Sequence, residues 1–159
     1  MMDRLLVSLT FLSALGTGLI AGLFFAFSAF VMTALSRLPS EQGIAAMQSI
    51  NIAVLNPLFS TVFMGTALTS VVLTIFSFFK WGEGDAVYLL MGGLLYVVGS
   101  FLVTIMCNVP LNDVLATVDP SSTEGAEVWT RYISSWTAWN HVRTLASLAA
   151  LASFILALR

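Results

Sequence analysis

The chain has 159 residues, of which 58% are hydrophobic and only 9% are charged, whereas about 25% of the residues in soluble domains are charged. This composition excludes an ordinary soluble globular protein. The six basic and eight acidic residues are scattered and give a net charge of -2, so no basic stripe is available to bind a phosphate backbone. We therefore expect no nucleic-acid partner.

Four stretches are long and apolar enough to cross a lipid bilayer, since a spanning helix needs about 20 mostly apolar residues. The runs are continuous rather than alternating, which favours helices over the strands of a barrel. The sequence therefore predicts one all-α transmembrane domain over residues 1–159, folded as a four-helix bundle with antiparallel neighbours. The predicted spans are residues 5–35, 52–79, 86–109 and 139–158.

The segments between the spans carry turn signals. Residues 1–4 resemble the charged start of a signal peptide, but the apolar run that follows is about twice too long for an h-region, so we expect a retained first helix. Residues 38–41 end that helix and begin a short one, and residues 80–85 form a polar hairpin. Residues 119–125 predict a loop, followed by an amphipathic segment over 126–136. Short helical segments are thus expected in the loops opposite the two termini.

The distribution of basic residues bears on orientation. Arg4, Lys80 and Arg159 lie on the side of the termini, and Arg37, Arg131 and Arg143 lie on the other, which is a tie. Arg143 falls within the fourth apolar run and is set aside because it has a candidate role there. The remaining bias favours termini that face the cytoplasm.

Polar residues gather towards the membrane face opposite the termini. On the fourth helix, Thr137, Asn140, His141 and Thr144 follow the i, i+3, i+4, i+7 spacing of one helical face, which Arg143 flanks. Polar side chains on a membrane helix normally face the bundle interior or a wet cavity, so this stripe is expected to point inward. Two plainer alternatives remain: hydrogen bonds that only tie helices together, and an Arg143 that extends to the lipid headgroups.

Two asparagine and proline units lie on the same side. Pro110, between Asn108 and Asn112, has no N–H for the preceding helical turn, so the third helix should kink or end there and form the lip of a pocket. Asn56 with Pro57 is either a second such unit or the start of the second helix.

Aromatic residues cluster nearby, at Trp129, Tyr132, Trp136 and Trp139. They predict either an interfacial belt or the aromatic mouth of a pocket for a flat hydrophobic substrate. In the first helix, small residues recur at every fourth position from 14 to 26, which indicates close packing against a helix of the same chain, of a second copy or of another membrane protein.

The residue types restrict the chemistry. One histidine and one cysteine cannot build a metal site with several strong ligands, although a haem with His141 as its single axial protein ligand, or with a methionine opposite, stays open. His141 is the one side chain whose ordinary pKa lies near neutrality, with amides and Arg143 around it. This set suits removal of a proton from an aromatic hydroxyl or activated CH group, and stabilisation of the resulting oxyanion.

Residues 46–51 (AMQSIN), 56–57 (NP), 108–112 (NVPLN) and 136–144 (WTAWNHVRT) together resemble the anthrone oxygenase-like family. The resemblance implies a four-helix integral membrane protein. Its bacterial members are mostly a domain of unknown function, whereas fungal relatives oxidise anthrones to anthraquinones without a metal or organic cofactor. By resemblance we expect an integral protein of a bacterial plasma membrane that acts on a hydrophobic small molecule and dioxygen.

If the fungal chemistry carries over, His141 deprotonates the anthrone, and Asn108, Asn112, Asn140 and Arg143 hold the enolate, which then reduces dioxygen. The expected substrate-binding residues are Asn56, Tyr132, Trp136, Trp139, Thr137 and Thr144. The rival hypothesis is a non-catalytic membrane module that binds haem, quinone or lipid, or a small subunit of a larger membrane complex.

Overall fold

The computed structural model describes residues 2–82 and 84–159, and every element within these ranges is helical. The first long helix is α1 (Met2–Ala26), which continues through the π-helix η1 (Phe27–Val31) into α2 (Met32–Ser36). A shorter helix, α3 (Ser40–Ala53), leads to α4 (Pro57–Phe79). The chain then forms α5 (Ala86–Tyr96), the π-helices η2 (Val97–Leu102) and η3 (Thr104–Asn108), and α6 (Val109–Thr117). The last helix is α7 (Thr123–Ala157).

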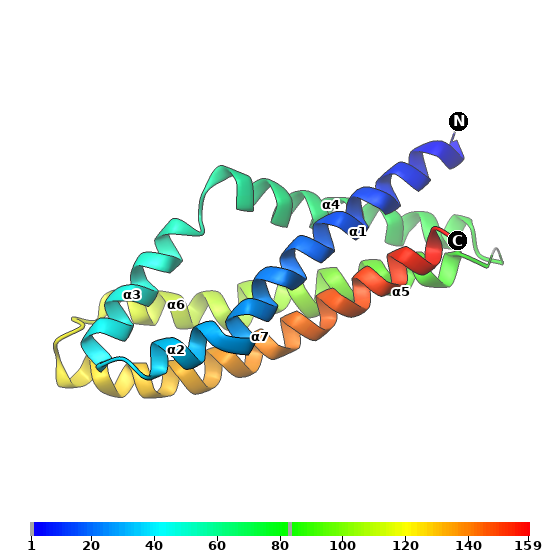
Figure 1. Cartoon of the computed structure of the whole chain (residues 1–159). Helices are drawn as coiled ribbons and strands as arrows, with labels where there is room; N and C mark the ends of the chain where they lie inside the picture. Colours follow the sequence, from blue (N-terminus) through cyan, green and yellow to red (C-terminus); the bar gives the residue numbers. More distant parts are fainter. Residues whose placement is uncertain (1, 83) are drawn as a thin grey trace.

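These elements confirm the predicted all-α architecture. Four continuous helical stretches are long and apolar enough to cross a membrane: residues 4–36, 57–79, 86–117 and 123–157. α1 packs against α4 and α7, and α5 packs against the same two helices, so the four stretches close into a bundle. Figure 1 shows both termini at one end, which we call the terminal end. α2, α3, α6 and the first half of α7 form the opposite end, the far end.

Three predicted boundaries differ from the structure. The second span starts at Pro57 rather than residue 52, because Asn56 caps α4 by accepting a hydrogen bond from the Phe59 N–H (3.0 Å). The third helix passes through Pro110 to Thr117 instead of ending near residue 109. Pro110 lies in the first turn of α6, directly after a π-helix, where its missing N–H is tolerated.

The fourth helix also begins earlier than predicted. Residues 126–136 are the first part of α7 and not a separate segment, because Ser122 caps the helix by accepting from the Gly125 N–H (2.9 Å). The preceding turn is fixed by Asp119, whose carboxylate accepts from the Ser121 N–H and hydroxyl. These two hydrogen bonds lower the pKa of the Asp119 carboxyl group below its ordinary value.

The small residues of α1 do not all lie in the same kind of environment: some are buried against other helices, and at least one is exposed. Ala14 is buried, and Gly18 lies near Leu151 of α7, where an added Cβ would make an ordinary contact at 3.6 Å. Gly22 is exposed, with open space where a Cβ would stand. At Gly16, a Cβ would collide with the Thr66 side chain of α4, so α1 and α4 lie close together there.

Candidate functional site

The far end contains a buried arginine on the inner side of α7. Arg143 is 3% exposed. It lies between two groups of buried apolar residues, with its guanidinium carbon 4.1 Å from the centre of the Phe24 ring and 5.0 Å from that of Trp136. A contact between a cation and an aromatic face contributes up to about 2 kcal/mol of favourable free energy when water is excluded. Burial of a charge costs several kcal/mol, so these contacts offset only part of that cost.

The hydrogen bonds of Arg143 use neutral partners. Its Nη1 donates to Thr104 Oγ1 (3.2 Å), and its Nη2 donates to Asn140 Oδ1 (2.8 Å). The Nε–H is buried and has no hydrogen-bond partner among residues 2–82 and 84–159. In the described part of the chain no carboxylate pairs with the guanidinium. A buried cation with a free donor and no counterion is a natural site for an anionic ligand.

Arg143 lies on the wall of a cavity of about 410 Å³ at the far end. Most of the wall is apolar or aromatic, with polar side chains among them. The lining residues are Leu23, Phe24, Phe27, Met47, Gln48, Ile50, Asn51, Ile52, Val54, Leu55, Phe59, Thr104, Val109, Asn112, Asp113, Ala116, Trp136 and Arg143. Ile52 is 76% exposed and Leu55 is 74% exposed, so this part of the wall borders the outside of the bundle. An apolar cavity with a few polar groups is typical of a small-molecule site.

Asn112 presents a hydrogen-bond donor in this wall. Its Oδ1 accepts from the Tyr132 hydroxyl (2.8 Å) and from the Trp136 indole N–H (2.9 Å). Because both partners are donors, the oxygen must face them, and the Nδ2 group keeps its hydrogens for another acceptor. Together with Arg143, Asn112 gives the cavity two donors suited to an oxyanion.

Gln48, in contrast to Asn112, presents a hydrogen-bond acceptor to the cavity. Its Nε2 donates to the carbonyl oxygens of Leu115 (2.8 Å) and Val118 (3.2 Å) at the end of α6. Its Oε1 therefore remains an acceptor in the cavity wall, where the Asp113 carboxylate is also found. The wall thus combines donors, acceptors and one buried cation.

Three of the predicted site residues line this cavity: Arg143, Asn112 and Trp136. Others support it from behind. Tyr132 is 2% exposed and holds Asn112, while Asn140 is fully buried and holds Arg143. Thr144 is buried, and its hydroxyl donates to the Asn140 carbonyl (2.8 Å).

His141 takes a different position. It is exposed and does not line the cavity, and its Nδ1 is 3.0 Å from Ser28 Oγ. Ser28 Oγ accepts from Asn140 Nδ2 (2.8 Å), so hydrogen bonds connect the imidazole to Arg143 through Ser28 and Asn140. The general-base role of His141 stays a prediction.

The remaining predicted residues lie outside the cavity wall. Asn108 is 1% exposed; its Nδ2 donates to the Trp136 carbonyl (3.2 Å), and its unpaired Oδ1 is an acceptor, not a donor for an oxyanion. Asn56 is an exposed helix cap. Trp139 is 41% exposed, in agreement with an interfacial position. Thr137 is half-buried, and its hydroxyl has no partner among the described residues.

Several wall residues were not predicted. Gln48 and Asn51 belong to one of the four sequence motifs, and Asp113 follows Asn112, so their proximity to the site could have been inferred. Phe24 and Thr104 of the wall carry no such signal, and neither does Ser28, which contacts Asn140 behind the wall. They lie within apolar runs, and their contacts with α7 arise only when the helices pack.

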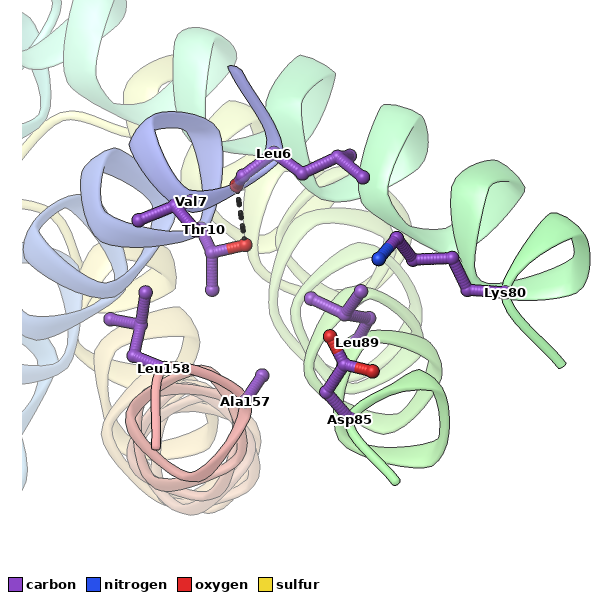
Figure 2. Close-up of a pocket in the computed structure, with 8 residues that line it drawn as sticks. All are labelled: Leu6, Val7, Thr10, Lys80, Asp85, Leu89, Ala157 and Leu158. Carbon is purple, nitrogen blue, oxygen red and sulfur yellow. Dashed lines mark hydrogen bonds between the residues drawn. The ribbon is translucent and has the colours of Figure 1, made fainter. Parts of the chain in front are cut away.

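A second cavity, of about 470 Å³, lies at the terminal end between the start of α1, the α4–α5 turn and the end of α7 (Figure 2). The side chains of Lys80 and Asp85 extend into the region of this cavity. The Thr10 hydroxyl is satisfied by the Leu6 carbonyl (2.7 Å), as the dashed line shows. Within residues 2–82 and 84–159, no group of three or more His, Cys, Asp or Glu side chains is arranged to hold a metal ion.

The family model for anthrone oxygenase matches residues 58–153, which is more than half of the chain. The chain belongs to this family. The matched segment includes Asn112, Trp136 and Arg143 of the cavity wall, and the match confirms the resemblance indicated by the motifs. No curated protein and no solved structure matches the chain.

Proposed function

We propose that this anthrone oxygenase family member is a membrane oxygenase whose far-end cavity binds a flat, hydrophobic substrate of the anthrone type as its enolate. The observation that carries the proposal is Arg143, a buried cation with a free Nε–H on an otherwise largely apolar wall. A polycyclic enolate matches both features, since its rings suit the aromatic wall and its oxyanion suits the guanidinium.

In the proposed reaction the substrate first loses a proton from the CH₂ group opposite its carbonyl. The enolate is stabilised by hydrogen bonds from Arg143 and the Asn112 amide, in a site where low polarity strengthens them. The electron-rich anion passes one electron to dioxygen, and the two radicals combine to form a C–O bond. The peroxide is protonated, the second CH proton leaves, and the O–O bond breaks with release of water.

This sequence balances without a further reductant. One oxygen atom of dioxygen becomes the new carbonyl and the other becomes water, while the substrate supplies the electrons and both hydrogens. The proposal therefore requires no metal or organic cofactor. A membrane location suits it, because the flat substrate and dioxygen both partition into lipid, and the exposed Ile52 and Leu55 side chains border the cavity from outside.

Two groups are candidates for the proton acceptor. Asp113 is on the cavity wall, so its carboxylate would accept the proton directly. Histidine is the residue type that most often serves as a general base, but His141 reaches the site only through Ser28 and Asn140. Comparison of Asp113→Asn with His141→Ala in the assay below distinguishes them, because loss of the direct base should lower kcat by about 10²-fold or more.

The test is oxygen uptake by the detergent-purified protein with an anthrone, with protein-free micelles as the background. We expect one dioxygen consumed per anthrone, and a rate lowered by about 10²- to 10³-fold in Arg143→Met. Arg131→Met, an exposed arginine of the same helix, is the matched control and should leave the rate unchanged. Wild-type uptake at the background rate would contradict the oxygenase, and binding without turnover would favour the non-catalytic module.

A further inference from the structure

Ser28 is the point at which the first transmembrane stretch meets the polar stripe of α7. Its hydroxyl oxygen accepts from Asn140 Nδ2 (2.8 Å) and lies 3.0 Å from His141 Nδ1 and 3.1 Å from Thr144 Oγ1. Ser28 lies in the π-helix η1, directly after Phe27 of the cavity wall. Such π-helical turns displace side chains from the ordinary helical register and are frequent at functional sites.

The contacts of Asn140 extend this arrangement to the cavity. Its Nδ2 donates to the Phe24 carbonyl (2.8 Å) as well as to Ser28, and its Oδ1 accepts from Arg143 Nη2 (2.8 Å). The amide is fully buried, and both of its N–H groups donate hydrogen bonds. The two acceptors therefore fix which way the amide faces, and only this orientation presents an oxygen to the guanidinium.

We propose that Ser28 is a positioning residue for the anion site: it orients the Asn140 amide, which in turn holds Arg143 on the cavity wall. The imidazole of His141 and the Thr144 hydroxyl hold Ser28 from the other side. Removal of the Ser28 hydroxyl leaves a buried N–H of Asn140 without its acceptor. The Phe24 carbonyl then holds the amide nitrogen alone, so the amide is less firmly fixed and its oxygen is less well aligned with Nη2 of Arg143.

This inference rests on the proposed function, and its test uses binding so that turnover is not required. The ligands are 2-naphthoate, which is ionised at neutral pH, and its neutral methyl ester, titrated against the purified protein with protein-free micelles subtracted. The wild type should bind the anion more tightly than the ester. Ser28→Ala should reduce this preference about tenfold, the loss of one buried hydrogen bond, and leave the ester affinity unchanged.

Two further variants separate positioning from general damage to the fold. Ser28→Thr keeps the hydroxyl and should restore the preference for the anion. Ser36→Ala removes an exposed hydroxyl of the same helical stretch, which donates to the Thr33 carbonyl, and should have no effect.

The outcomes that overturn the inference are distinct. A full preference in Ser28→Ala would show that the anion site does not depend on Ser28, while the site itself would stand. Equal weakening of both ligands with a lowered melting temperature would assign Ser28 a structural role. No preference in the wild type would instead remove the anion site, and with it the proposed function.

Discussion

The two ends of the bundle contain cavities of similar volume, about 470 Å³ at the terminal end and about 410 Å³ at the far end. Towards the terminal end, the buried polar groups are mainly hydroxyls that are satisfied nearby. Ser13 donates to Thr69 (2.7 Å), Thr17 donates to the Ser13 carbonyl (2.8 Å), and Ser70 is the exception with an unpaired hydroxyl. The Ser13–Thr69 bond joins α1 to α4, the Thr17 bond stays within α1, and neither involves a charged group.

The far end differs in the chemistry of its buried groups, not in the volume of its cavity. It encloses a guanidinium and fixed amides, and hydrogen-bonding capacity on Arg143 and Asn108 remains unused. Cavity volume therefore does not distinguish the two ends of the bundle. The buried charge of Arg143 is a better indicator of a ligand site than cavity volume. Its contacts offset only part of the free energy of burying it, and a bound anion can supply the missing interaction.

The largest loss of stability is expected from mutation of Asn112, because its amide oxygen accepts two hydrogen bonds at the far end. Asn112→Ala leaves the Tyr132 hydroxyl and the Trp136 N–H without their acceptor, and should lower the free energy of unfolding by about 3 kcal/mol. Asn112→Asp keeps an acceptor for both donors and should fold nearly as well, yet it adds a negative charge that repels an anion. Chemical denaturation and 2-naphthoate binding separate the two effects. An Asn112→Asp variant with wild-type affinity would place the anion elsewhere.

In the terminal half of the bundle, we expect stability to be most sensitive to added side-chain volume between closely packed helices. Gly93 of α5 faces α4, and an added Cβ would lie 2.6 Å from the Ser70 carbonyl oxygen, which cannot move without the backbone. Gly93→Ala should therefore cost about 2 kcal/mol of stability. Gly65→Ala on α4 has open space and serves as the control, with stability unchanged or slightly raised. Equal melting temperatures for Gly93→Ala and the wild type would show that the α4–α5 contact is looser than described.

The smallest of these effects is expected at His141. If the imidazole acts through Ser28, His141→Ala should weaken the preference for 2-naphthoate by no more than Ser28→Ala does. The double variant should then resemble the Ser28→Ala single variant, since the two residues belong to one network. Additive losses would indicate independent roles, and a rate loss of about 10²-fold with unchanged binding would support His141 as the direct base.

The sequence predicts the four spans well, because apolar length alone determines which segments can cross a bilayer. The start of α7 is less predictable. Gly125 and the turn before it are typical of a loop, and only the Ser122 cap shows that the helix has already begun. The π-helices of the first and third spans have no sequence signature, since they depend on a shift in the backbone hydrogen bonds.

The site was predictable where its residues lie close together in sequence. Arg143 and Trp136 follow from the polar and aromatic stripe of the fourth helix. The stripe could not place His141, because neighbours on a helix are about 100° apart and Asn140 takes the inward position. Ser28 and Thr104 were beyond sequence reasoning. A hydroxyl in a membrane helix usually bonds its own backbone, as Thr104 does with the Ser100 carbonyl, and its second contact appears only on packing.

The anion site is tested best by the affinities of the wild type and Arg143→Met for 2-naphthoate and for its methyl ester, measured side by side. We expect the wild type to prefer the anion, and Arg143→Met to lose this preference while it binds the ester as before. Replacement of the buried charge by an apolar side chain should leave the bundle folded. An Arg143→Met variant that still prefers the anion would contradict the assignment of the far-end cavity as an anion site.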